Sequence, residues 1–460
     1  MNAKPPGQPA GVDERLVQEI STRRDEPEWI TRSRLDAVGL LAELSDPDWW
    51  DQPTGFDPAN LAVAAEIEAR WGTGHPPPEA PAATGSPDAE STGDGSSGAG
   101  STGDGSGGFR NAAVASRFDA ARVFAEQQAA LARSGVVFCD LGTAVTEHGD
   151  LVRPHLGSLV PPDGDRLAAV TAAVWSGGTF LYVPAGRRID VPLQSFDRIR
   201  SASPTRFHRT VIVADEGASV QYIDGCVSPV YTVDPLRSAT VEIFVGPSAE
   251  VSYTTVQNWS PNVVDVATTA AAVHREGRLV LTAGTIGARR TVRRSEVRLL
   301  GDHAAADCRT VSYAGDGQFQ DVVTAVSHEA SRTGSTLRSR AVADRGGRIH
   351  HRDTIGVAGD TGGCTADIDG SALTLDDGAD VVVGVAVPEE PSAITATRRT
   401  GTAAIDDDLL FDLMSSGVSR PLATALVVDG FIEPIIATLP TEYAVEWSRL
   451  IELQLRGAIG

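Results

Sequence analysis

A run of short β-rich segments, free of any helical pattern, extends from about Leu181 to Ala396 and constrains the fold more than any other feature. In segments such as VIVADEGASVQY, VEIFVGPSAEVSY and LTLDDGADVVVG, β-branched residues flank small polar turns. The turns recur at intervals of roughly 26 to 43 residues, a loose repeat typical of a solenoid in which each coil covers the next. A β-sandwich would contain similar strands, but the uninterrupted length of the run favours a parallel β-helix.

The segments on either side of this run have different patterns, so the chain divides into five regions. Apolar residues at near-helical spacing predict helical regions at 1–73 and 401–460, and 111–180 is a mixed α/β region. Residues 74–110 form a Gly, Ser and Pro linker that buries too little apolar surface to order itself. The β-helix core is expected over 181–400, which makes the predicted fold mainly β with helical ends.

The charge and the composition exclude several classes of function. The chain has 460 residues and a formal net charge of −22, and Lys4 is its only lysine. An acidic surface does not favour nucleic acid or an anionic membrane as a partner. A phosphate-binding loop requires its lysine, so ATP hydrolysis is not expected in this chain. The sequence contains no apolar leader, no stretch of about 18 apolar residues and no C-x-x-C pair, which predicts a soluble protein of the reducing cytoplasm.

Several segments resemble sequence motifs of the SufB family, whose members assemble iron–sulfur clusters. The resemblance begins with DEPEWITRSRLDA and continues through RSGVVFCDLGTAV, RTVIVADEGASVQYIDGCVSP, SYTTVQNWSPN and YAGDGQFQD. It ends with GFIEPIIATLPTEYAVEWSRLIELQLRGAIG, and it covers the chain apart from the 74–110 linker. Together these motifs are specific enough to identify the chain as a divergent member of that family.

This resemblance implies an architecture and a set of partners. It implies a right-handed parallel β-helix between helical ends, in a scaffold subunit that is not itself an enzyme. Such a subunit pairs through its β-helix with a SufD-like protein or with a second copy of itself, and its C-terminal helical region holds a SufC-type ABC ATPase. It accepts sulfur from a cysteine desulfurase or another sulfur donor and builds a transient iron–sulfur cluster. Binding of the flavin FAD is a further implied property.

Four residues correspond to the sulfur chemistry of the family. Cys226, in YIDGC, matches the sulfur acceptor, and Arg198, Gln257 and Trp259 match residues of an internal sulfur path. A thiolate is the nucleophile that persulfide transfer requires. Taken by themselves, the residues also allow a buried structural thiol at Cys226 and a satisfied inward polar ladder at Gln257.

The chain departs from the family at several path and ligand positions. Thr269 stands near the position of a path lysine, and Arg200 replaces an asparagine. The family's cluster-ligand cysteine falls at Ile368, Asp369 or Gly370, and none of these is a cysteine. The resemblance therefore supports the architecture of the family more strongly than the building of a standard cluster.

Other candidate metal ligands are few. Cys364 lies at least four residues from the expected ligand position, roughly 13 Å along a strand. His350 and His351 are adjacent, so on a strand at most one of them faces a given site. Arg398 and Arg399 replace a His-Glu pair of the family, and a guanidinium group cannot ligate iron because it stays protonated. These arginines could instead bind an anion or a carboxylate of a partner.

Two functional hypotheses follow, with a third that has little support. The first is a scaffold subunit that accepts sulfur at Cys226 and builds a cluster with its partners. The second is a divergent paralogue that keeps the architecture of the complex but performs a specialised sulfur or metal transfer step or acts as an adaptor. A carbohydrate-active β-helix enzyme is the third, but no paired-carboxylate site stands out. Cys139 and Cys308 are interpreted as buried structural thiols.

Overall fold

The computed structural model describes residues 12–47, 113–115, 131, 133–198, 206–227, 236–359, 361–387, 394–439 and 441–455. The predicted 74–110 linker lies outside these residues. For Arg198 and Cys226 the model describes the backbone and its register. None of the described helices is both long and apolar enough to span a bilayer.

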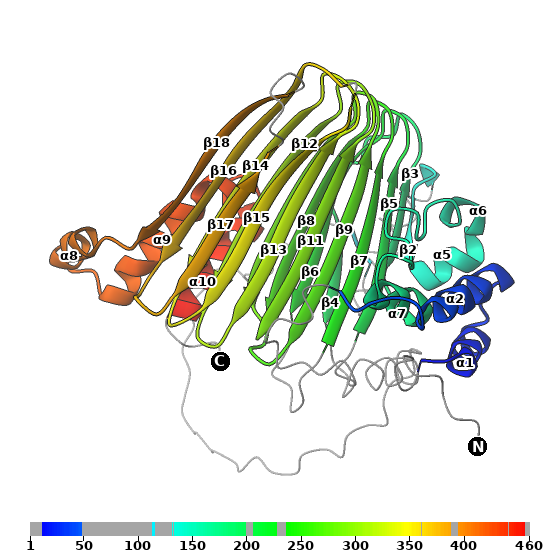
Figure 1. Cartoon of the computed structure of the whole chain (residues 1–460), viewed down its shortest axis with the longest axis horizontal. Coiled ribbons are helices and arrows are strands. Elements are labelled where there is room, and N and C mark those ends of the chain that lie inside the picture. The colour runs from blue at the N-terminus through cyan, green and yellow to red at the C-terminus, as the bar shows by residue number, and fades with distance from the viewer. Residues whose placement is uncertain are drawn as a thin grey trace, which may run out of the picture.

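The core is a parallel β-solenoid made of two nine-stranded sheets, which confirms the predicted fold class. Sheet A contains β1 (Ala113–Ala115), β4 (Leu193–Arg198), β6 (Ser219–Val227), β8 (Glu250–Trp259), β10 (Arg278–Gly287), β12 (Ala305–Ala314), β14 (Gly334–Ala343), β16 (Cys364–Thr374) and β18 (Ile394–Ala404). Sheet B contains β2 (Val137–Asp140), β3 (Thr179–Val183), β5 (Arg206–Ala214), β7 (Leu236–Val245), β9 (Val264–Val273), β11 (Arg290–Leu299), β13 (Phe319–His328), β15 (Arg348–Val357) and β17 (Asp380–Ala386). From β4 onward, successive strands alternate between the sheets, so each coil contributes one strand to each (Figure 1).

The turns from sheet B to sheet A have a common backbone geometry. Each contains one residue in the left-handed region, and the residues that adopt it in successive coils are Gly217, Ser248, Glu276, His303 and Arg332. Small polar segments tolerate this conformation better than β-branched residues do, which accounts for the composition of the turns. Backbone hydrogen bonds join each turn to the next one, as from the Ser248 amide to the Arg275 carbonyl at 2.8 Å. The turns therefore stack as regularly as the strands.

The solenoid interior is filled by every second residue of each strand. Tyr222, Tyr253 and Leu281 are in register on β6, β8 and β10, and all are buried in one apolar cluster. Because side chains alternate along a strand, the residues between them face outward. On the outside, an apolar face needs cover from another element.

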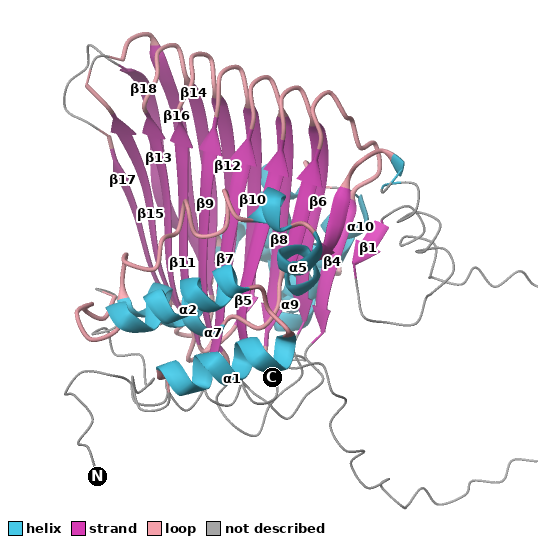
Figure 2. Ribbon diagram, turned by 90° about the vertical axis from the view of Figure 1, so that its right-hand side faces the viewer, coloured by secondary structure: helices cyan, strands magenta, loops and turns pink. Residues whose placement is uncertain are grey.

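Helices supply this cover at both ends of the solenoid. At the N-terminal end lie α1 (Glu14–Arg24), α2 (Glu28–Leu40), α5 (Leu141–Glu147), α6 (Gly149–Val152) and α7 (Arg166–Val174). Figure 2 shows α1, α2 and α7 beside the strands of sheet B, and α7 packs on β5 and β7. At the other end lie α8 (Asp407–Ser415), α9 (Arg420–Ile436) and α10 (Thr441–Leu455). There α9 packs on sheet A, and Trp447 of α10 lies against Gly284 of β10.

Candidate functional site

Cys226 lies near the C-terminal end of β6, in a row of residues that runs across sheet A. The register pairs it with Asp197 on one side and with Gln257 on the other. The row continues from Gln257 to Thr285 on β10 and then to Ser312 on β12. Gln257, Thr285 and Ser312 are buried. Cys226 therefore shares its register row with a line of buried polar side chains that passes from coil to coil.

Gln257 and Trp259 are each about 1% exposed and carry polar atoms into the solenoid. The Gln257 side-chain amide donates to the Thr255 hydroxyl at 2.8 Å. Within the described residues, the Gln257 Oε1 and the Trp259 indole nitrogen have no hydrogen-bond partner. A closed apolar core would not leave such groups unsatisfied, because each costs about 1–3 kcal/mol when buried without a partner. A water molecule could satisfy these two atoms.

A charged network beside Trp259 was not predicted from the sequence. The Arg237 guanidinium donates to the Asp265 carboxylate at 2.9 Å and lies 5.1 Å from the centre of the Trp259 ring. Arg293 is 4.0 Å from the other oxygen of the same carboxylate. All three charged groups are nearly fully buried. The only sequence signal was a charged residue at an inward position of an otherwise apolar strand, as Asp265 in VDVATTAAAV.

A second set of polar side chains extends this network toward Cys226. The Tyr253 hydroxyl donates to the Asp224 carboxylate at 3.4 Å, and Asp224 also accepts from the Ser195 hydroxyl at 3.0 Å. Burial, reinforced by Asp224, raises the pKa of Tyr253 well above its ordinary value, so its hydroxyl stays protonated. Asp224 and Cys226 are two residues apart on β6, so their positions belong to the same face of the strand. The polar interior therefore extends from Asp224 to Arg293.

Arg198 is the last residue of β4, and the register pairs it with Val227 rather than with Cys226. Asp197 is the β4 residue opposite Cys226. Thr269, near the position of the missing path lysine, is buried on β9 and is in register with Ser295 of β11. Arg200 lies outside the described residues. The roles assigned to these positions by resemblance stay predictions.

The candidate metal ligands do not lie together. His351 is buried and its Nε2 is 3.0 Å from the Asp353 carboxylate, whereas His350 faces the other way and packs edge-on against Phe319. Cys364 is buried, accepts a hydrogen bond from Thr333 at 3.3 Å, and lies six residues from Gly370, about 20 Å along β16. Among the described residues, no group of three or more His, Cys, Asp or Glu side chains could hold a metal ion.

Arg398 and Arg399 lie on β18, the outermost strand of sheet A. Both side chains are exposed, and Arg399 forms an ion pair with Asp367 of β16 at 3.1 Å. The register pairs Arg398 with Ile368 and Arg399 with Asp369, two of the expected ligand positions. This end of the solenoid therefore presents cations where the resemblance leads one to expect metal ligands.

The two remaining cysteines are poor nucleophiles. Burial, together with Asp140, raises the pKa of Cys139 to about 11. Cys308 is fully buried, and its pKa is raised further, again chiefly by burial. A thiol with so high a pKa is not a thiolate at neutral pH. Cys308 is buried as predicted, whereas Cys139 is only partly buried.

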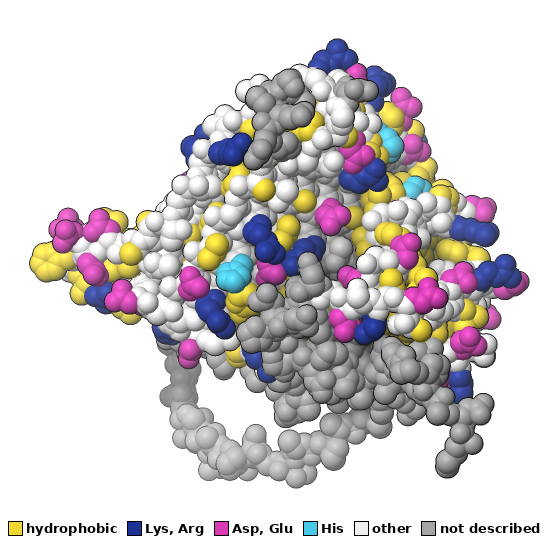
Figure 3. All heavy atoms as spheres, in the orientation of Figure 1, with side chains coloured by type: hydrophobic (Ala, Val, Ile, Leu, Met, Phe, Trp, Pro, Cys, Tyr) yellow, Lys and Arg dark blue, Asp and Glu magenta, His cyan; other side chains and the backbone are white. Residues whose placement is uncertain are grey.

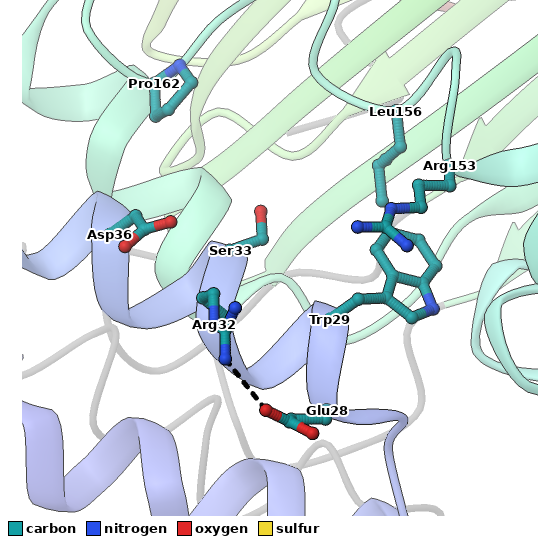
Figure 4. Close-up of a pocket in the computed structure, with 8 residues that line it drawn as sticks. All are labelled: Glu28, Trp29, Arg32, Ser33, Asp36, Arg153, Leu156 and Pro162. Atoms are coloured by element: carbon teal, nitrogen blue, oxygen red, sulfur yellow. Dashed lines mark hydrogen bonds and ion pairs between the residues drawn. The ribbon is translucent and has the colours of Figure 1, made fainter.

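A surface pocket of about 600 Å³ is formed by residues that precede the polar interior in the sequence (Figure 4). It is lined by Trp29 of the DEPEW segment, by Arg153 above the indole ring, and by Arg32, Glu28 and Asp36 of α2. In Figure 4 the Arg32 guanidinium is bonded to Glu28, at 2.8 Å. The two carboxylates offset the two guanidinium groups, so the pocket does not fit the diphosphate of FAD. No step through a flavin follows from these residues.

Comparison with known proteins gives the same family along most of the chain. A model of the SUF system FeS cluster assembly SufBD core domain matches residues 198–431, and a model of the SufBD protein N-terminal region matches residues 116–195. An iron–sulfur cluster assembly SufBD family protein of Staphylococcus haemolyticus is 34% identical over 458 residues, which cover 98% of this chain and 94% of the relative. Proteins of the same description from Staphylococcus aureus strains MRSA252 and USA300 have equal identity and coverage.

Proposed function

Because the chain belongs to the SufBD family of iron–sulfur cluster assembly proteins, we propose that it acts as a SufB-like subunit, accepting sulfur at Cys226 and scaffolding cluster formation. The observation that carries this proposal is the register of sheet A, in which Cys226 stands next to the buried Gln257. Sulfur bound at Cys226 would enter a row of polar side chains that continues through the coils. Iron and sulfur are here the substrates of assembly.

The proposal includes a separate ATPase of the SufC type. This chain has a single lysine, at position 4, and so lacks the lysine of a phosphate-binding loop elsewhere. The C-terminal helices present an apolar surface that a partner could cover. On α8, Phe411 is 69% exposed beside Leu409 and Met414, and this helix projects from the body at the left of Figure 3. A groove of about 500 Å³ between α9 and α10 is lined in part by Leu422, Leu426 and Val445.

A second partner is proposed at the end of the solenoid. Within the described part of the chain, β17 pairs only with β15, and β18 pairs only with β16. Unpaired strand edges are templates for pairing with another chain. A SufD-like protein or a second copy of this chain would cover these edges. We further propose that a cysteine desulfurase or another persulfide donor supplies the sulfur and that the assembly works in the cytoplasm.

Replacement of the proposed acceptor tests this function directly. The full-length Cys226→Ser variant is expected to take up no labelled sulfur from a persulfide donor, because a hydroxyl does not accept sulfane sulfur as a thiolate does. Cys139→Ser is the matched control and is expected to load like the wild type, since the pKa of Cys139 is raised to about 11. Labelled sulfur is counted after separation from the donor. Undiminished loading of Cys226→Ser would remove this residue from the mechanism.

A further inference from the structure

Inside the solenoid, the Asp265 carboxylate lies in hydrogen-bond or ion-pair range of two guanidinium groups. Arg237 is 2.9 Å from its Oδ1, and Arg293 is 4.0 Å from its Oδ2. The side chains are 6%, 3% and 0% exposed for Arg237, Arg293 and Asp265 respectively. Asp224 also attracts Arg293, at longer range. Arg293 therefore has a carboxylate at 4.0 Å, at the limit of an ion pair and beyond hydrogen-bond distance.

The Arg293 guanidinium also has unused hydrogen-bond donors. Among the described residues, neither its Nε nor its Nη2 meets an acceptor, although both atoms are buried. The Thr291 hydroxyl, two residues earlier on the same face of β11, is buried and likewise has no partner there. Thr291 is in register with Asp265, which brings its hydroxyl to the same layer of the interior. Two donor groups thus line one stretch of β11.

These donors call for an acceptor that carries negative charge. A guanidinium stays protonated even when buried, although burial lowers the pKa of Arg293 while Asp265 opposes that change. Removing a charge from water without a close partner costs several kcal/mol, and the low local dielectric strengthens its attraction for an anion. A water molecule could accept the hydrogen bonds but would bring no negative charge into hydrogen-bond distance of the guanidinium.

We propose that Arg293 and Thr291 form an internal binding site for one small monovalent anion, next to Asp265, whose partner Arg237 lies over the Trp259 ring. Hydrosulfide and the terminal sulfur of a persulfide belong to this class, and so does a halide ion. The existence of the site depends only on the geometry of β9 and β11. Its assignment to sulfur rests on the proposed function: two external thiols would reduce a Cys226 persulfide to the Cys226 thiol and hydrosulfide, forming a disulfide between themselves, and the released hydrosulfide would be the anion bound here.

Bromide is a suitable probe, because it is a monovalent anion of similar size to hydrosulfide and scatters X-rays anomalously. The full-length protein would be purified and crystallised with sodium bromide in place of chloride. We expect an anomalous peak within hydrogen-bond distance of the Arg293 guanidinium, and its loss in Arg293→Met. Arg294→Met is the matched control, since Arg294 faces outward on the same strand and pairs with Asp321 at 2.8 Å. A wild-type crystal with only water beside Arg293 would overturn the site.

Two further variants keep the test decisive if Arg293→Met does not fold. Arg293→Lys retains the positive charge and is expected to retain the bromide peak. Thr291→Val removes one donor and keeps the shape of the side chain, so it is expected to lower the bromide occupancy. Full occupancy in Thr291→Val together with an unchanged peak position would exclude Thr291 from the site.

Sulfide binding separates this site from the proposed sulfur acceptor. Equilibrium dialysis with radiolabelled sulfide would use the full-length Cys226→Ser protein, in which loading at that cysteine cannot occur. Adding Arg293→Met is expected to weaken sulfide binding by about 10- to 100-fold, the effect of losing a charge-assisted hydrogen bond. Equal binding with and without Arg293 would refute the assignment to sulfur. If sulfide binds at Arg293 but the wild-type protein takes up no sulfur at Cys226 from the persulfide donor, the proposed function is refuted and the anion site stands.

Discussion

At the scale of single residues, the solenoid interior contains two kinds of polar side chain. Some are fully satisfied, such as His328, whose two ring nitrogens lie 2.7 Å from the Thr333 hydroxyl and 2.9 Å from the Ser335 hydroxyl. Others, such as Gln257, keep an unused atom in the described interior. The first kind stabilises the coils, and the second kind marks where an occupant can bind.

His328 makes the stability of the protein dependent on pH. Burial lowers its pKa from 6.5 to about 4, so between these values the unfolded chain binds a proton that the folded chain does not. The free energy of unfolding therefore falls as the pH drops from 6.5 to 4, by about 3 kcal/mol from this residue. Denaturant titrations at several pH values should show that the free energy of unfolding depends less steeply on pH in His328→Gln than in the wild type. An equal slope in His328→Gln and in the wild type would contradict the assignment.

At the scale of elements, close contacts of single side chains help to position helices α2 and α10. Arg34 of α2 is fully buried, where it pairs with Glu26 at 2.7 Å and donates to the Trp175 carbonyl at 3.0 Å. On the other side, Trp447 of α10 lies directly over Gly284, where sheet A has no side chain. These contacts add to the apolar packing of the helices, which buries Ile30 and Val38 of α2 and Ile451 of α10.

Adding one methyl group at Gly284 should therefore disturb α10. A Cβ at this position would lie 2.1 Å from the Trp447 ring, so Gly284→Ala must displace the indole or the helix. Such overpacking costs about 1–3 kcal/mol, which outweighs the gain of about 0.4–1 kcal/mol from a stiffer unfolded chain. Urea denaturation followed by tryptophan fluorescence measures the loss. Gly401→Ala, with no atom near its added Cβ, is the control, and equal stability of the two variants would show that the contact is not tight.

At the scale of the whole molecule, helices pack at both ends of the solenoid, but the last coil keeps open strand edges. The outer edges of β17 and β18 have no partner strand in the described part of the chain. Arg398 and Arg399 lie on that last coil, beside Ile368 and Asp369. An assembly in which a partner chain covers this end and contributes ligands would complete a cluster site that this chain does not build from its own described residues.

Reconstitution of the assembly distinguishes the two functional hypotheses. The chain would be co-expressed with a SufC-type ATPase and a SufD-like protein, and then supplied anaerobically with iron and sulfide. A scaffold subunit should give the visible absorption of an iron–sulfur cluster, because its partner supplies the missing ligands. The chain alone is expected to give much weaker absorption and serves as the control. If the complete assembly shows no such absorption at any stoichiometry, the divergent paralogue becomes the better description.

Sequence patterns by themselves determined the family, the solenoid and the position of Cys226. Strand–turn–strand repeats are a local property, because each coil must alternate apolar and polar residues and must turn at small polar segments. Motifs such as YIDGC and VQNW are also local, so they identified Cys226, Gln257 and Trp259 without any knowledge of contacts. Their recognition did not require the fold.

Only the tertiary structure decided which polar residues meet. Gln257 follows Cys226 by one coil, and their adjacency depends on the strand register, which small differences in turn length can shift. The same applies to Arg237, Asp265 and Arg293, which come from three strands and form one buried network. Burial then determined the chemistry, because a guanidinium on an exposed strand is solvated, whereas inside the solenoid its charge must be balanced by other buried groups. The spacing of residues along the chain reveals neither the strand register nor the burial of these side chains.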